Sequence, residues 1–325
     1  MCKKVILLFL SSLFLFSCQK EESIALKNTS SKLNTVSVII DDQMWNGEIG
    51  DSVRNKFASP VIGLPQEEPL FTINQYPVKL MEGFMTDSRN IILIKKADEN
   101  HFQIKKDIFA KPQNVFCISG KSTKDILDLI QGKSPEIIQT IKAAEIKESQ
   151  TLNGPSLLNT KKLKDRFQID MDVPSTYSYV LQDANFLWLK KEIVSGNTSL
   201  LIYQVPLNSI EKSDNLVATI IKKRDSIGKL YIHGKEPNTD MITEEAYAPY
   251  FFKVNIDGKV AYEMKGTWVL KNDFMSGPFI NYTIIDKENN RALVLEGFCY
   301  SPSKEKRDLM HELEAIIKSV DFLKR

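Results

Sequence analysis

The stretch Tyr250–Leu270, which reads YFFKVNIDGKVAYEMKGTWVL, decides the fold of this chain. Two runs rich in β-branched and aromatic residues flank Asp257-Gly258, and an Asp-Gly pair between such runs is a strong signal for a tight β-hairpin. Further long strands are expected at Phe279–Asp286 and Arg291–Tyr300. Because tight turns join antiparallel neighbours, this region predicts an antiparallel sheet and not a Rossmann-type parallel sheet.

Helices and shorter strands are predicted on both sides of this stretch. Helices over about 214–227 and 304–320 each carry one apolar stripe at helical spacing. A small basic helix at 161–167 and strands near 177–181, 185–192 and 200–205 come earlier in the chain. We therefore predict a C-terminal α+β domain over residues 156–325.

The first half of the chain has a similar mixture. TVSVIID at Thr35–Asp41 predicts a strand, and a helix is expected over 42–57. A later helix begins at Ser122, is expected to break at Gly132, and restarts at Ser134-Pro135. We predict a second α+β domain over 34–155, with a mainly antiparallel sheet and a boundary near Asn153. Its other strands are expected near 70–74, 90–96, 102–108 and 114–119.

The start of the chain resembles a bacterial lipoprotein signal. A basic start precedes an apolar run over 5–16, shorter than the about 20 residues that a membrane span needs. The run ends in LFSC at 15–18, which resembles a lipobox. The resemblance implies that residues 1–17 are removed and that Cys18 carries acyl chains, which anchor by about 0.8 kcal/mol per buried CH₂. The alternative is a soluble exported protein with an unmodified Cys18.

The residues after Cys18 resemble a sorting signal. Lys20-Glu21-Glu22 is similar to a surface-export signal of some two-membrane bacteria. It implies a lipoprotein on the outer face of the outer membrane, with a periplasm-facing lipoprotein as the alternative. Because residues 23–33 (SIALKNTSSKL) are polar and unpatterned, we expect residues 18–33 to form a lipidated, flexible tether.

Composition and charge exclude several classes of protein. The chain has 325 residues, of which 42% are hydrophobic and 26% charged, as in ordinary folded proteins and unlike disordered chains. Removing residues 1–17 takes two lysines from the 43 basic residues and leaves 41 basic and 41 acidic residues. Without a basic excess to neutralise phosphates, we expect no nucleic-acid partner.

Cysteine and histidine residues are few. Cys117 and Cys299 lie in apolar, strand-like runs and are either two buried thiols or one disulfide between the halves. The histidines lie far apart in the sequence and away from cysteine, so a metal site is not expected. No motif of the chain indicates a cofactor, and none is expected.

Two family resemblances cover the chain. The order of strands and helices over about 165–325 is similar to the PsbP-like α/β/α sandwich, a fold that implies docking more than catalysis. Over nearly the whole chain, several stretches resemble an uncharacterised family of bacterial lipoproteins classed as a domain of unknown function. This family implies no activity and no site residues. The stretches are LPQEEPLF (64–71), RDSIG (224–228), ITEEAYAPY (242–250), KGTW (265–268) with NDFM (272–275), and ELEAII (312–317).

A third resemblance is to GDSL-type ester hydrolases. Gly50-Asp51-Ser52-Val53 and Asp308-Leu309-Met310-His311 are similar to the two end blocks of those enzymes. The resemblance implies Ser52 as nucleophile, His311 as its base and Asp308 as the residue that orients the base. The blocks that supply the oxyanion site have no counterpart in this chain.

Two further groups of residues are candidate binding or catalytic features. Tyr247, Tyr250, Trp268 and Phe274 are amphipathic aromatics that form either a binding face for sugars, peptides or proteins, or part of the core. The carboxylate pairs at 67–68 and 244–245 are either solvated loop charges or, across pairs, a glycosidase-like couple.

The favoured interpretation is an envelope lipoprotein of α+β fold with a non-catalytic docking, accessory or binding role at the outer membrane. Its expected contacts are the membrane, through the lipid on Cys18, and an envelope protein or a glycan. A lipid-anchored hydrolase that uses Ser52 and a glycan- or peptide-binding module around Trp268 are the alternatives.

Overall fold

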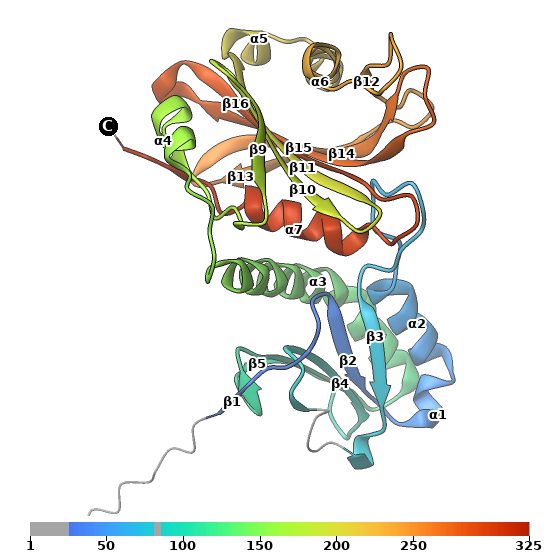
Figure 1. Cartoon of the computed structure of the whole chain (residues 1–325). Helices are drawn as coiled ribbons and strands as arrows, with labels where there is room; N and C mark the ends of the chain where they lie inside the picture. Colours follow the sequence, from blue (N-terminus) through green and yellow to red (C-terminus); the bar gives the residue numbers. More distant parts are fainter. Residues whose placement is uncertain (1–25, 81–85, 325) are drawn as a thin grey trace, which may run out of the picture.

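A computed structural model describes residues 26–80 and 86–324 as two domains stacked along one axis. Helix α3 (Thr123–Asn153) lies between them, with the N-terminal sheet on one side and α7 (Arg307–Ile317) on the other (Figure 1). The predicted α+β class is confirmed.

The N-terminal domain contains a five-stranded sheet in the order β3-β2-β4-β7-β5. The first four of these strands run parallel, and β5 alone is antiparallel to its neighbour. The strands are β2 (Thr35–Ile39), β3 (Thr72–Tyr76), β4 (Asn90–Lys96), β5 (His101–Lys106) and β7 (Asn114–Gly120).

The prediction of a mainly antiparallel sheet is therefore wrong for this domain. All five residues of β2 (TVSVI) are buried, and most residues of β4 and β7 are buried as well. A strand covered on both faces reads as a continuous apolar run, and such runs are typical of parallel strands. The absence of alternation in TVSVI and NIILI was the signal for parallel pairing.

The helices of this domain also differ from the prediction. The single helix expected over 42–57 is split into α1 (Asp42–Trp45) and α2 (Glu48–Phe57), with Gly47 as the N-cap of the second. Conversely, α3 continues through Gly132 and Pro135 without a break. Buried isoleucines before and after this point pack on one core, so tertiary contacts maintain the helix where local propensity is poor.

The C-terminal domain contains an eight-stranded antiparallel sheet in the order β12-β14-β15-β16-β11-β10-β9, with β13 also paired to β14. Asp257 and Gly258 both have positive φ, as a tight two-residue hairpin turn requires. The predicted hairpin is thus confirmed. The strands are β9 (Ser178–Asp183), β10 (Phe186–Ile193), β11 (Gly196–Pro206), β12 (Met241–Thr243), β13 (Tyr250–Ile256), β14 (Lys259–Leu270), β15 (Ser276–Asp286) and β16 (Arg291–Tyr300).

Helices cover both faces of this sheet (Figure 1). On one face α4 (Lys161–Phe167) and α7 bury Phe167 and Ile316 in a core with the sheet. On the other face α5 (Asn208–Glu211) and α6 (Leu216–Tyr231) bury Ile210 and Ile220 in a second core. Short elements complete the chain: β8 (Ile169–Asp170) paired with β17 (Asp321–Phe322), η1 (Val78–Leu80) and η3 (Lys287–Asn289). The PsbP-like resemblance stays a prediction.

The segment before β2 is attached to the N-terminal domain. β1 (Lys27–Asn28) pairs in parallel with β6 (Ala110–Lys111), and the carbonyls of Ser31 and Lys32 accept hydrogen bonds from Arg89. Residues 26–33 therefore belong to the folded domain and not to a flexible tether. The predicted signal peptide and Cys18 lie outside the described residues. Within the described ranges, no helix has the length and apolar character needed to cross a membrane.

Candidate functional site

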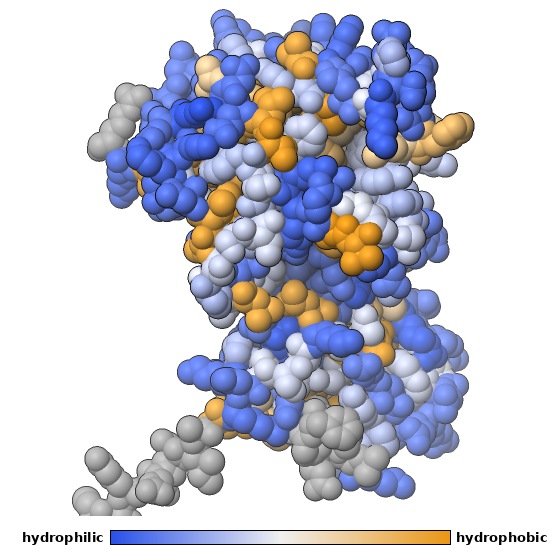
Figure 2. Space-filling model, viewed as in Figure 1, coloured by the Kyte–Doolittle hydropathy of each residue, from blue (hydrophilic) through white to orange (hydrophobic). Residues whose placement is uncertain are grey.

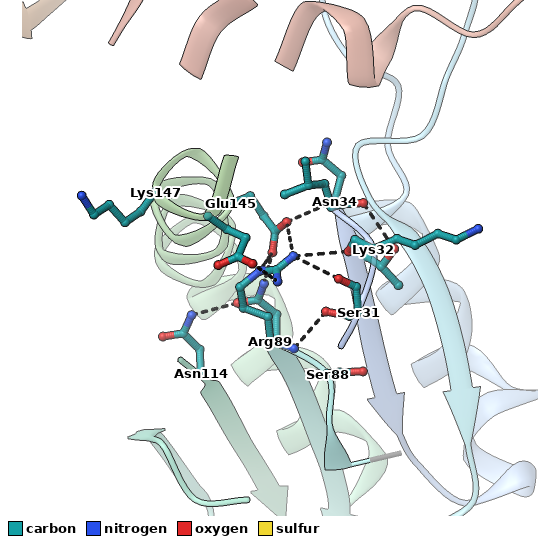
Figure 3. A network of polar contacts seen from close by, with 12 residues as sticks. Ser31, Lys32, Asn34, Ser88, Arg89, Asn114, Glu145 and Lys147 are labelled. Atoms are coloured by element: carbon teal, nitrogen blue, oxygen red, sulfur yellow. Dashed lines mark hydrogen bonds and ion pairs between the residues drawn. The ribbon is translucent and has the colours of Figure 1, made fainter. Parts of the chain in front are cut away.

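Buried charges of the N-terminal domain form one network (Figure 3). Glu145 of α3 is fully buried and accepts from Arg89 through both oxygens, from Nε at 2.9 Å and from Nη2 at 3.0 Å. The side chain of Asn90 and the backbone N–H of Asn34 also donate to this carboxylate, at 2.6 Å and 2.8 Å. Glu148 places a second carboxylate 3.3 Å from Arg89 Nη1.

This network lies at the amino ends of the parallel strands. Asn34 precedes β2, and Asn90 and Asn114 begin β4 and β7. Ligands of parallel sheets bind outside the opposite, carboxyl edge. Because both oxygens of Glu145 are already hydrogen-bonded within the network, we interpret it as structural, and removal of one partner of such a buried pair costs about 3–5 kcal/mol.

The carboxyl edge of the same sheet carries a crevice of about 350 Å³. Lys96 at the end of β4 and Thr123 at the start of α3 are among the residues that line it. The first turn of α3 is closed by its own capping box, in which Ser122 Oγ accepts from the backbone of Asp125 and the Asp125 carboxylate accepts from the backbone of Ser122. The N–H groups that bind anions at other helix starts are therefore partly occupied here.

A loop over residues 58–71 extends from the N-terminal domain to the C-terminal domain. Near its end, Glu68 is 6% exposed, and its carboxylate accepts the backbone N–H of Lys306 at 2.7 Å and 3.0 Å and that of Arg307 at 2.7 Å. A carboxylate at a helix start satisfies N–H groups that lack partners within the helix and interacts favourably with the helix dipole. Glu68 therefore fixes this loop to the start of α7.

More hydrogen bonds cross between the domains. Asn34 Nδ2 donates to Asp308 at 2.9 Å, and the ring Nε2 of His311 donates to the backbone carbonyl of Glu145 at 3.2 Å. Gln150 of α3 donates to the backbone of α7 at 3.1 Å. The two domains are thus joined by polar contacts along α3 and α7 as well as by the loop. In Figure 2, hydrophobic residues are also visible at this narrow waist, over α3.

The loop separates two hollows. On one side lies a cavity of about 230 Å³, bounded by the loop, α3, α7 and strands β14 and β15. On the other side lies an open groove of about 700 Å³, between the loop and the residues around β12, β13 and β14. Residues 60–64 line both hollows, so the loop is their common wall.

Charged groups at the cavity form a paired cluster. Lys265 Nζ lies 3.2 Å from both Glu263 and Glu314, and Lys318 donates to Glu314 at 2.5 Å. Burial opposes ionisation of Glu314, but Lys265 and Lys318 outweigh it and hold the pKa of this carboxyl far below its usual value. Burial alone would lower the pKa of Lys265, but Glu314 and Glu263 outweigh it and raise that pKa.

The groove contains exposed aromatic rings. Tyr247 is 74% exposed and Tyr250 is 49% exposed, and both line the groove. The side chain of Glu244 accepts the backbone N–H of Ala246 at 2.9 Å and so stabilises the turn that carries Tyr247. Glu67, from the loop, lines the groove as well. We take this groove as the candidate functional site.

The predicted hydrolase triad is not assembled. Ser52 lies within α2 and not at a sharp turn directly after a strand, where such a nucleophile belongs. His311 and Asp308 hydrogen-bond across the domain boundary, to Glu145 and Asn34. No hydrogen bond between Ser52 and His311 is found in the part of the chain that the structure describes.

The predicted aromatic face is only partly present. Trp268 is 2% exposed, and its ring N–H donates to the carbonyl of Cys299 at 3.2 Å, so its assignment to a binding face is wrong and it belongs to the core. Phe274 is fully exposed but is not among the residues that line the groove. Of the four predicted aromatics, the structure brings Tyr247 and Tyr250 together.

The cysteines are separate thiols. Cys117 and Cys299 are free, which settles the alternative left open by the sequence. Burial raises the pKa of both thiols, and that of Cys299 to about 12. Within the described ranges, no group of three or more His, Cys, Asp or Glu side chains is arranged to hold a metal ion.

Sequence reasoning missed two of the residues that organise this region. Glu145 continues the helical spacing of Ile137 and Ile141, so a carboxylate in register with a buried stripe was the available signal. Glu68 was weighed only as a loop charge or half of a catalytic couple. Nothing local distinguishes it from its neighbour Glu67, because its partner in the structure is a helix start that is distant in sequence.

Comparison with known proteins identifies two families. Residues 156–319 match the Domain of unknown function (DUF4837), and residues 29–153 match the Domain of unknown function (DUF8532). The two matches meet where α3 ends. A comparison with curated proteins gives no match. The predicted membership of an uncharacterised family is confirmed: the chain belongs to the DUF4837 family, whose match spans about half of its length.

Proposed function

We propose that the protein is a lipid-anchored protein of the cell envelope that binds an extended, basic segment of another envelope protein in the groove. The observation that supports this proposal most directly is that Tyr247 and Tyr250 are exposed on the walls of that groove. Tyrosine offers a large apolar surface, a polar hydroxyl and few rotatable bonds, and it is enriched among residues that contribute most to binding.

The charge of the groove supports a basic partner. Its lining includes the carboxylates Glu67 and Glu244 and, among the described residues, no lysine or arginine. A segment that carries lysine or arginine would meet complementary charge there. The lipobox-like residues at 15–18 support attachment of the lipid at Cys18, and Lys20-Glu21-Glu22 supports the outer face of the outer membrane over the periplasm-facing alternative.

The test of the groove is site-specific photocrosslinking in the native cell. A photoreactive residue at position 247 is expected to crosslink one or a few proteins, identified by mass, and Tyr247→Ala with Tyr250→Ala is expected to weaken recovery of the same partners. Leu230 on α6 is 64% exposed and provides a matched control position outside the groove lining. Crosslinks to glycan or lipid alone, or the same products from both positions, would contradict the proposal.

The anchor is tested separately. Cys18→Ser is expected to move the protein from the membrane fraction to the soluble fraction and to abolish incorporation of labelled fatty acid. Unchanged membrane association of this variant, with no labelled lipid in the wild-type protein, would refute the lipid anchor and would not affect the groove.

A further inference from the structure

Of the four cationic side chains around the cavity, three are paired with a carboxylate and one is not. Lys265, Lys318 and Arg307 each have a carboxylate partner within 3.2 Å. Lys142 of α3 also lines the cavity, and within the described part of the chain its ammonium has neither a hydrogen bond nor an ion pair. One positive charge at this cavity therefore has no carboxylate within ion-pair distance. The carboxylates that pair with the other cations are Glu263, Glu314 and Asp308.

The surroundings of Lys142 favour the binding of an anion. The residue is exposed and lines the cavity. Burial by the surrounding protein and the charge of Lys265 lower the pKa of its ammonium and outweigh the opposing effect of Glu314 and Glu263, which lie beyond ion-pair distance. An ammonium that is partly desolvated and close to another cation gains most from a bound anion, through a charge-assisted hydrogen bond.

The remaining walls of the cavity are mainly apolar and aliphatic. Leu64 and Phe71 come from the N-terminal domain, Ile146 from α3, and Phe279 and Met310 from the C-terminal domain. The volume of this cavity is about 230 Å³. This space suits a short aliphatic chain and is too small for a diacyl lipid.

We propose that this cavity binds a small aliphatic monocarboxylate, with its carboxylate on Lys142 and its chain against the apolar wall between the domains. A single unpaired cation matches a single negative charge better than the charge of close to two on a free phosphate. The site is distinct from the groove on the other side of the loop, so it stands or falls independently of the proposed partner protein.

The probe for this site is octanoate labelled at its carboxyl carbon, titrated into the full chain and followed by carbon NMR below its micelle concentration. We expect saturable binding to one site. Lys142→Gln is expected to weaken binding by about tenfold or more, because it removes a charge-assisted hydrogen bond. Lys142→Arg retains the charge and is expected to restore most of the affinity.

The controls separate charge recognition from nonspecific binding. Lys147 is exposed on the same helix, and its side chain points away from the polar network in Figure 3, so Lys147→Gln is expected to bind octanoate as the wild type does. Octanol is expected to bind wild type and Lys142→Gln equally. Absence of octanoate binding, equal binding by Lys142→Gln, or displacement of octanoate by inorganic phosphate at equal concentration would overturn the proposal.

Discussion

At the scale of single residues, removal of the Glu68 side chain should weaken one defined contact, the attachment of the loop over residues 58–71 to the start of α7. Its carboxylate satisfies two backbone N–H groups at the start of α7. Glu68→Ala leaves these buried donors without a partner, and we expect the free energy of unfolding to fall by about 1–3 kcal/mol. Urea denaturation measures this change. Glu67→Ala removes an exposed neighbour and should stay within about 0.5 kcal/mol of wild type.

His311 is the residue that should make stability depend on pH. Burial lowers its pKa from 6.5, although the carbonyl of Glu145 and the carboxylates of Glu314, Glu145 and Asp308 act in the opposite direction. The unfolded chain therefore takes up the proton first as the pH falls. The stability contributed by neutral His311 is complete above about pH 6.5 and is lost as the pH drops toward the folded-state pKa.

Unfolding experiments at about pH 7.5 and about pH 5 test this dependence. His311→Gln retains a donor for the Glu145 carbonyl but does not titrate, so the loss of stability between these two pH values should shrink. The carboxyls of Asp308 and Glu314 have lowered pKa values, so their effects belong to more acidic conditions. An equal loss in the variant and in wild type would assign the pH dependence to other groups.

Residue-scale prediction from sequence succeeded where chemistry is local. The separate thiols Cys117 and Cys299 match one of the two alternatives that the sequence left open, and Tyr247 and Tyr250 are exposed, as a binding face requires. For Trp268 the sequence left core and binding face open, because a tryptophan on a strand gives the same pattern whether its face is inside or outside; the structure places it in the core. The unpaired charge of Lys142 had no local signal, because it arises from packing between the two domains.

At the scale of elements, two helical glycines should respond in opposite ways to alanine. A Cβ at Gly132 in α3 would meet no atom within 4 Å, and Gly132→Ala should stabilise the protein by about 0.5–1 kcal/mol. A Cβ at Gly228 in α6 would lie 1.9 Å from the carbonyl oxygen of Met241. Gly228→Ala should therefore cost at least about 1 kcal/mol, because the helix must move away from β12.

Thermal and urea unfolding of the two glycine variants side by side checks this contrast. Stabilisation by Gly228→Ala would show that α6 can shift away from β12 without cost. A destabilised Gly132→Ala would mean that α3 needs the flexibility of glycine one turn before Pro135.

The elements show which sequence signals are reliable. The Asp257-Gly258 hairpin was predicted because its turn chemistry is local. The continuity of α3 and the parallel N-terminal sheet were not predicted, because both depend on partners distant in sequence. Pro135 remains within a helix because buried residues before and after it pack on the same core. Strand β2 is parallel to β3 because the connection between them includes two short helices and crosses back over the sheet.

At the scale of the whole molecule, the two domains should unfold together. Glu68, Asn34 and His311 all contact the other domain or its helices. Trp45 belongs to the N-terminal domain and Trp268 to the C-terminal domain, so variants that keep one of them as the only tryptophan report each domain. The two urea midpoints should coincide. Two separated transitions would show that the contacts between the domains are too weak to couple them.

The division of the chain into two α+β halves was visible in the sequence, since Asn153-Gly154-Pro155 is a strong turn signal between two sets of strands and helices. How the halves are joined was not. The loop over residues 58–71 contains prolines and carboxylates that look like any surface connection. Its role depends on a helix start more than 200 residues later in the chain, at Lys306.

The pairing of β1 with β6 has a consequence for how far the protein stands from a bilayer. If Cys18 carries the lipid as proposed, about nine residues connect it to Lys27, and an extended chain of that length reaches about 30 Å. A free tether as far as residue 33 would reach about 50 Å. The chain enters the N-terminal domain at the end remote from the C-terminal domain (Figure 1). The N-terminal domain would then stand close to the lipid headgroups, and the C-terminal domain would project outward as the part that other molecules meet first.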